Sequence, residues 1–160
     1  MGPDITPAEY RALAELRYRI RHFLREGDAK ARAVGLEPQQ YLMLLAIHGL
    51  PEGSEATIQT LAERLALKHH SAVELVDRLE MNGYVRRTRS RDDRRLVFVS
   101  LLPRGERLLE QVARNRISEL RTSGEALVGA IEALLERGQH NGNDRKKTAK
   151  REKQEKRARR

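Results

Sequence analysis

The stretch from Thr57 to Leu101 limits the possible folds of this chain more than any other part of its sequence. Two successive runs in it carry apolar residues at intervals of three and four, which is the repeat of an α-helix. The first run contains Leu61, Ala62 and Leu65, and the second contains Val73, Leu75, Val76 and Leu79. Only residues 66–68 separate the runs. The pattern predicts a short helix, a tight turn and a longer helix, which together form a helix-turn-helix.

Gly83 follows the second run, at the position where a helix commonly ends in the left-handed conformation that glycine adopts without steric cost. Residues 84–88 and 95–101 then read as two strands around a polar turn, which predicts a β-hairpin. We call this hairpin the wing. It carries six arginines against two aspartates, a local net charge of +4, at Arg86, Arg87, Arg89, Arg91, Arg94 and Arg95, with Asp92 and Asp93.

These motifs resemble the MarR family of bacterial transcription regulators. The residues that carry the resemblance are Leu61-Ala62-Glu63-Arg64-Leu65, Leu75-Val76-Asp77-Arg78-Leu79-Glu80, Gly83-Tyr84-Val85, and Asp93-Arg94-Arg95 with Val99 and Leu101. The similarity covers about Thr6 to Glu136. It implies a mainly α (α+β) fold, a winged helix-turn-helix flanked by long N- and C-terminal helices that pair two subunits into a homodimer.

The remaining segments fit one such domain over residues 1–136, with its DNA-binding core at about 54–101. Thr6-Pro7 can cap and start a first dimerisation helix over about 6–34, although 27–35 reads equally as a helix end. Pro38 opens a helix that runs to His48 and is apolar on most sides, which indicates burial. Ala56-Thr57 could add a short third strand below the wing. The second dimerisation helix is expected over about 103–136, broken at Ser123-Gly124.

The net charge of +9 is concentrated at the C-terminal end. Residues 137–160 contain eleven Lys and Arg and three Asp and Glu, whereas the other 136 residues are close to neutral. Because almost no apolar residue occurs there, the segment cannot bury enough surface to offset its ordering entropy, and a disordered basic tail is expected. Its composition from Ala149 onward favours a helix on a polyanion, and it should contact phosphates without reading bases.

The second helix of a helix-turn-helix enters the major groove with its N-terminal residues nearest the base edges. We therefore expect the DNA contacts of this recognition helix to come from Lys68, His69, His70, Ser71, Glu74 and Arg78. Glu74 has two readings, since it can accept from a cytosine amino group or pair with Arg78 one turn later. Adjacent histidines on a helix point about 100° apart, which argues against a shared metal ion.

The wing supplies the other expected contact, because arginines on a slender hairpin suit the narrow minor groove. The expected set is Arg86, Arg87, Arg89, Arg91, Asp93, Arg94 and Arg95. The resemblance implies that Asp93 orients Arg95 and that Arg91 or Arg94 inserts at the tip. The alternative is a solvated charged turn. The resemblance also implies a small-ligand pocket, for which we expect Arg19, Phe23, Tyr41 and Leu45.

Several functional classes are disfavoured. The chain has no cysteine, which excludes disulfides and thiol-based sensing, and it contains no catalytic motif, so neither an enzyme nor a cofactor or metal is expected. No apolar run is long enough to cross a membrane, and a cytoplasmic, nucleoid-associated protein is the simplest expectation.

The predicted function is a dimeric repressor that binds a pseudo-palindromic operator in double-stranded DNA and leaves it when a small effector binds. One rival is a non-specific DNA-packaging protein that relies on the basic tail. The other is a winged module that binds protein.

Overall fold

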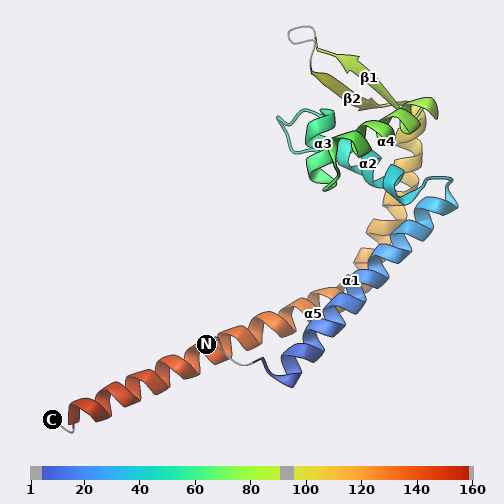
Figure 1. Cartoon of the computed structure of the whole chain (residues 1–160). Helices are drawn as coiled ribbons and strands as arrows, with labels where there is room; N and C mark the ends of the chain where they lie inside the picture. The colour runs from blue at the N-terminus through green and yellow to red at the C-terminus, as the bar shows by residue number, and fades with distance from the viewer. Residues whose placement is uncertain (1–4, 91–95, 159–160) are drawn as a thin grey trace. The chain divides into compact units, whose positions relative to one another are not determined.

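A computed structural model describes residues 5–90 and 96–158 (Figure 1). The elements in chain order are α1 (Pro7–Ala33), α2 (Pro38–His48), α3 (Ile58–Arg64), α4 (His69–Met81), β1 (Val85–Arg89), β2 (Val97–Leu101) and α5 (Pro103–Ala158). They form two compact units. One runs from Arg25 to Ser118 and contains the helix-turn-helix and the wing, and we call it the winged unit. The other combines residues up to Leu24 with those from Glu119 onward, and we call it the helical unit.

Helix α1 starts where the sequence predicts. The Thr6 hydroxyl accepts a hydrogen bond from the amide of Glu9 at 3.2 Å, and the Glu9 carboxylate accepts from the amide of Thr6 at 2.7 Å. This reciprocal pair is a capping box, which satisfies amides that have no partner within the helix. The ambiguous segment from residue 27 continues the helix to Ala33 and then ends at Gly35, whose φ is +83°.

The core of the winged unit lies between α2, α3, α4 and the wing. Its fully buried large side chains come from several elements and include Leu36, Met43, Leu44, Leu61, Val76, Leu79, Val85 and Val112. Helix α2 is less enclosed than its composition predicts. Met43 and Leu44 are buried, whereas Leu42 and Leu45 on the same helix are 37% and 40% exposed.

The predicted helix-turn-helix is confirmed. The Thr57 hydroxyl caps α3 by accepting from the amide of Thr60 at 3.1 Å. The corner that follows places Ala66 at φ +52°, a left-handed conformation that an alanine rarely adopts. On α4 the core-facing residues are Ala72, Leu75, Val76 and Leu79, while Val73 is only half-buried. The core-facing side of α4 therefore includes Ala72 and leaves Val73 at its edge, whereas the sequence predicts Val73 on that side.

The wing is also as predicted, as an antiparallel pair in which Val85 lies opposite Leu101 and Arg89 opposite Val97. Gly83 takes the expected left-handed φ of +69° between α4 and β1. The third strand is reduced to one bridge between Thr57 and Phe98, supported by a 2.8 Å hydrogen bond from the amide of Val99 to the carbonyl of Ala56. Residues 91–95 lie outside the described part of the chain.

Helix α5 corrects two predictions. It passes without interruption through Ser123-Gly124, and its backbone continues through the expected disordered tail to Ala158 (Figure 1). A single glycine inside a helix costs only about 1 kcal/mol relative to alanine, and strong helix formers on both sides outweigh that cost. The charged segment 145–158 is rich in Lys, Arg, Glu, Gln and Ala, which all have high helix propensity.

The first turn of α5 lies against the start of the wing. A Cβ on Gly105 would stand 2.2 Å from the carbonyl oxygen of Tyr84, so only glycine fits there. The same carbonyl accepts from the amide of Leu102 at 2.9 Å. The guanidinium of Arg104 stacks 5.1 Å above the Tyr84 ring and completes this junction.

Large apolar side chains remain exposed along both segments of the helical unit. Those with 40–65% exposure are Ile5, Tyr10, Leu13, Tyr18, Ile20, Leu24, Leu120, Val128, Ile131 and Leu135. Single exposed apolar residues are common on protein surfaces, whereas a repeated series on two helices is typical of an interface. None of the helices in the described residues is long and apolar enough to cross a membrane.

Candidate nucleic-acid interface

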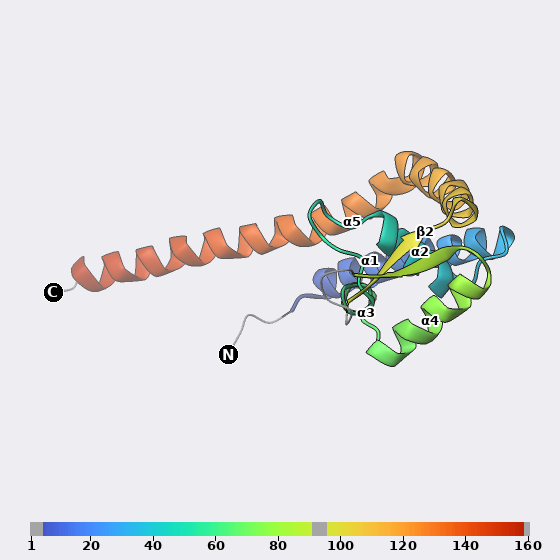
Figure 2. The ribbon, with the colours of Figure 1, turned by 90° about the horizontal axis from the view of Figure 1, so that it is seen from above.

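Helix α4 and strand β1 of the winged unit are joined at one end, and their other ends lie on the same side of the unit. Figures 1 and 2 both show α4 and β1 meeting at the turn that joins them and separating from there in a V. Strand β1 continues toward the wing tip, while the N-terminal end of α4 lies at the open side of the V. A duplex that met the N-terminal residues of α4 would therefore also meet the wing.

The outward face of α4 carries the side chains that the sequence predicts for DNA contact. Lys68, His69, His70, Glu74 and Arg78 are exposed, and Ser71 is half-buried. Lys68, His69, His70 and Ser71 lie at the N-terminal end, where free backbone amides and the helix dipole favour a phosphate, whereas Glu74 follows one turn later and Arg78 lies in the last turn. Their chemistry combines cations for phosphates with hydroxyl, imidazole and carboxylate groups for base edges.

The two readings of Glu74 are separated by the geometry. No ion pair joins Glu74 to Arg78 within the described residues, and both side chains are exposed. The helical pairing that the sequence favours is therefore not formed. Glu74 remains available to accept from a cytosine amino group.

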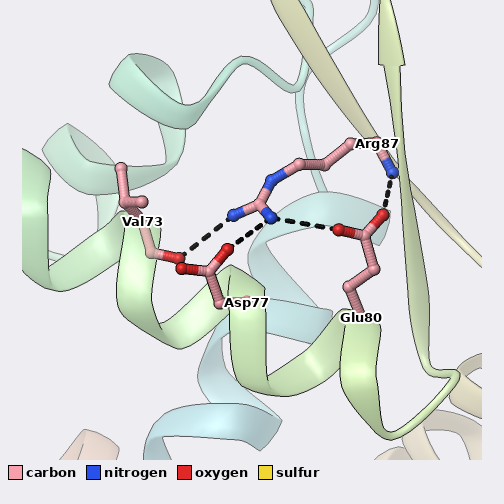
Figure 3. Close-up of polar contacts among 4 residues, drawn as sticks. All are labelled: Val73, Asp77, Glu80 and Arg87. Atoms are coloured by element: carbon pink, nitrogen blue, oxygen red, sulfur yellow. Dashed lines mark hydrogen bonds and ion pairs between the residues drawn. The ribbon is translucent and has the colours of Figure 1, made fainter.

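Arg87 differs from its neighbours in the wing because its side chain points onto α4 (Figure 3). One guanidinium nitrogen donates to the Glu80 carboxylate at 3.0 Å and also contacts Asp77, and the other donates to the carbonyl of Val73 at 3.1 Å. The backbone amide of Arg87 donates to the same Glu80 carboxylate at 2.9 Å. We call this set of contacts the Arg87 clamp. It fastens β1 to the recognition helix.

The clamp separates the described arginines of the wing into two groups. Arg86 and Arg89 are exposed and available to a phosphate, whereas the side chain of Arg87 is 23% exposed and faces two carboxylates. The sequence pattern alone groups all three as DNA contacts and assigns no role to Asp77 or Glu80. The signal that could have found these carboxylates is their spacing of three on one helix, which places both on one face.

The predicted wing tip lies outside the described residues. This applies to Arg91, Asp93, Arg94 and Arg95, whose expected minor-groove contacts stay predictions. The described strands lead into that turn from Arg89 and out of it at Val97.

The four residues expected at a ligand pocket divide between the two units. Arg19 and Phe23 belong to the helical unit, where Arg19 forms an ion pair with Glu15 at 2.7 Å. Tyr41 and Leu45 belong to the winged unit. Burial raises the pKa of the Tyr41 hydroxyl, and the positive charge of Arg116 partly opposes that shift. A shared pocket for these four residues stays a prediction.

An open groove of about 450 Å³ lies elsewhere in the winged unit. It runs between the end of α2, the loop that follows it and β2, and its lining includes Ile47, His48, Pro51, Val99, Leu101 and Glu106. None of the four predicted pocket residues lines it. Among the described residues, no group of three or more His, Asp or Glu side chains comes together as metal ligands would.

Comparison with known proteins finds similar sequences among transcription regulators. Residues 34–96 match a model described as the MarR family, and this range spans most of the winged unit. The HTH-type transcriptional regulator YsmB of Bacillus subtilis is 28% identical over 129 residues, covering 78% of this chain and 86% of YsmB. The chain therefore resembles the MarR family over residues 34–96.

Solved structures show the same fold. AbsC, a MarR family transcriptional regulator from Streptomyces coelicolor, superposes with a TM-score of 0.66 at 21% identity, covering 89% of this chain and 99% of AbsC. AbfR bound to DNA has a TM-score of 0.53 at 25% identity, covering 80% of this chain and 93% of AbfR. The chain thus shares the winged helix-turn-helix fold of these regulators.

Proposed function

We propose that this chain is a MarR-type, DNA-binding transcription regulator, and that it acts as a homodimeric repressor that binds a pseudo-palindromic operator and leaves it when a small ligand binds. The observation that carries the DNA-binding part is the V formed by α4 and β1. The exposed end of α4 and the exposed arginines of β1 lead to the same side, and the Arg87 clamp joins the two elements. One half of an operator can thus be contacted in the major groove by α4 and in the minor groove by the wing.

Dimerisation is supported by the exposed apolar series on the helical unit, which includes Leu13, Leu24, Val128 and Leu135. Leaving such a series in water is unfavourable, and a second copy of the same helices would cover it. A two-fold dimer requires a two-fold operator, with half-sites separated by about one helical turn, roughly 10 bp.

The ligand part of the proposal rests on the similarity to the MarR family and on the predicted pocket residues. A ligand releases DNA only if it binds one conformation more tightly than the other. Arg19 and Tyr41 offer a cation and a buried hydroxyl, for which aromatic acids are the natural first probes. A panel of such acids should raise the melting temperature of the free protein and lower its affinity for the operator.

Selection of bound sequences from a random duplex pool, with the full chain at constant salt, tests the proposal. We expect a two-fold motif, and we expect Ser71→Ala and His70→Ala to change preference at particular positions at a cost of about 1–3 kcal/mol per contact. Arg89→Ala should weaken binding without altering the motif, because phosphates carry no sequence information.

A non-specific DNA-packaging protein is the second candidate, and the net charge of +8 within residues 137–160 favours it. Recovery of no preferred sequence, with equal affinity for every duplex in the pool, would support that function over the repressor.

A further inference from the structure

An open groove on the winged unit has no part in the functions described so far. It lies between the end of α2, the loop that joins α2 to α3, β2 and the first turn of α5, and it has a volume of about 450 Å³. That volume falls within the range of small-molecule sites, about 300–1,000 Å³. We call it the α2–β2 groove. All of its lining residues belong to the winged unit.

The loop side of the groove is held in place by backbone hydrogen bonds. In the loop, the amide of Ser54 donates to the carbonyl of Pro51 at 3.0 Å, and Gly53 takes a φ of +79°. The amide of Val99 in β2 donates to the carbonyl of Ala56 at 2.8 Å, which attaches the end of the loop to the strand. This side of the groove therefore exists before any ligand binds, which lowers the entropic cost of binding.

The lining combines buried apolar side chains with exposed carboxylates. Val99 is buried and Ile47 and Leu101 are half-buried, so the inner part of the lining is apolar. Glu52 and Glu106 are exposed and come from two different elements, the loop and α5. Among the described residues, no Lys or Arg lines the groove and neither carboxylate has an ion-pair partner. The groove therefore offers an apolar surface beside two uncompensated negative charges.

We propose that the α2–β2 groove binds a small organic cation, an amine or quaternary ammonium that carries an aromatic or aliphatic body. The positive group is attracted by Glu52 and Glu106, and the body covers the apolar surface around Val99. The same two charges repel anions, so the ligand class differs from that expected at Arg19 and Tyr41. The inference does not rest on the proposed repressor function, because binding to this groove needs no DNA.

A bare metal ion fits the lining less well than an organic cation. Ca²⁺ and Mg²⁺ take six or more oxygen ligands, whereas no group of three or more His, Asp or Glu side chains comes together within the described part of the chain. A bare ion would also leave the apolar part of the lining in water, and covering that surface is favourable. The pairing of apolar surface with negative charge therefore selects an organic cation.

Titration of the isotope-labelled full chain with benzyltrimethylammonium tests the site through the amide chemical shifts of its ¹⁵N NMR spectrum. This probe has a permanent positive charge, an aromatic ring and about eleven heavy atoms, for which we expect a dissociation constant of about 1–10 mM in an open groove. Amides that line the groove should shift, whereas those of the recognition helix should not. The lining amides to follow are those of Gly53, Ser54, Ser100 and Leu101.

Two matched double variants test the role of the carboxylates. Glu52→Gln with Glu106→Gln removes both carboxylates of the groove, and Glu55→Gln with Glu63→Gln removes two carboxylates of the same unit that do not line it. All four side chains are exposed, so both variants should fold as the wild type does. At low salt we expect the groove variant to raise the dissociation constant about fivefold, as loss of two exposed ion pairs would. The control variant should change it less than about twofold, because exposed charges farther away are screened.

Four results would overturn the proposal. Equal shifts with phenylacetate, an anion with a similar ring, would exclude selection by charge, and equal losses of affinity in the two double variants would exclude Glu52 and Glu106 as its source. No shift of the lining amides up to about 50 mM benzyltrimethylammonium, well above the expected constant, would exclude the site. Shifts of the same amides by Mg²⁺ at a lower concentration than by the organic probe would identify a metal site instead.

Discussion

Arg87 and Glu80 are joined twice, because one carboxylate of α4 accepts both the backbone amide of β1 at 2.9 Å and the guanidinium at 3.0 Å. An arginine offers a planar fork of donors that a lysine cannot reproduce. The Arg87 clamp therefore fixes the distance between α4 and β1, the two elements that we propose contact DNA.

Removal of the clamp should lower both stability and operator affinity. We expect Arg87→Ala to reduce the free energy of unfolding by about 1–2 kcal/mol, because partly exposed ion pairs contribute little individually but three partners are left unpaired together. Arg87→Lys should recover only part of that stability. Urea unfolding measures the effect. Arg86→Ala is the matched control, since Arg86 is exposed and should change DNA affinity alone.

The junction between α5 and the wing should be intolerant of any side chain at position 105. Gly105→Ala would place a Cβ 2.2 Å from the Tyr84 carbonyl oxygen, and we expect it to destabilise the fold by about 3 kcal/mol, as overpacking does. Gly129→Ala is the control within the same helix. It meets no atom within 4 Å, so it should be neutral or stabilise by up to about 1 kcal/mol. Similar melting temperatures for the two would contradict the close approach.

The dimer should depend on the exposed apolar series of the helical unit. Leu13→Glu or Val128→Glu puts a charge where a partner would bury it, and we expect the dimer dissociation constant to rise at least about tenfold. Sedimentation at micromolar concentration measures this. Met81→Glu is the control, because Met81 is an exposed apolar residue at the end of α4. A wild-type chain that sediments only as a monomer would remove the basis for the dimer.

Tyr41 should make stability depend on alkaline pH. Burial raises its pKa above the ordinary value of 10.0, so over that range the folded state keeps a proton that the unfolded state has released. Stability should therefore decrease as pH rises past about 10. Chemical unfolding at several pH values, compared with Tyr41→Phe, measures this. The variant should show a flatter alkaline decrease, and an identical decrease would exclude Tyr41 as its source.

The sequence predicts the winged unit well because local rules determine it. Gly83 ends α4 in the expected conformation, and strand pairing follows from the apolar alternation around Val99. The outward residues of α4 follow from the helical repeat.

Long-range partners and helix continuity are predicted less well. From the sequence alone, an arginine in the wing indicates a DNA contact, because its neighbours in space are not known. The carboxylates that bind Arg87 come from a different element, α4. Ser123-Gly124 carries ordinary break signals, but a long helix tolerates one glycine at a small local cost. The expectation of a disordered tail rests on its missing apolar residues, whereas helix propensity depends on the backbone and not on burial.

The contact between Gly105 and Tyr84 has a mechanical consequence for the winged unit. With no side chain between them, the first turn of α5 cannot slide past the start of β1, and the Arg87 clamp holds the same strand to α4. The three elements are therefore joined in series, with β1 in contact with both helices. We expect a rotation of the beginning of α5 to move the wing and α4 together, so that both would change their angle to a duplex at the same time.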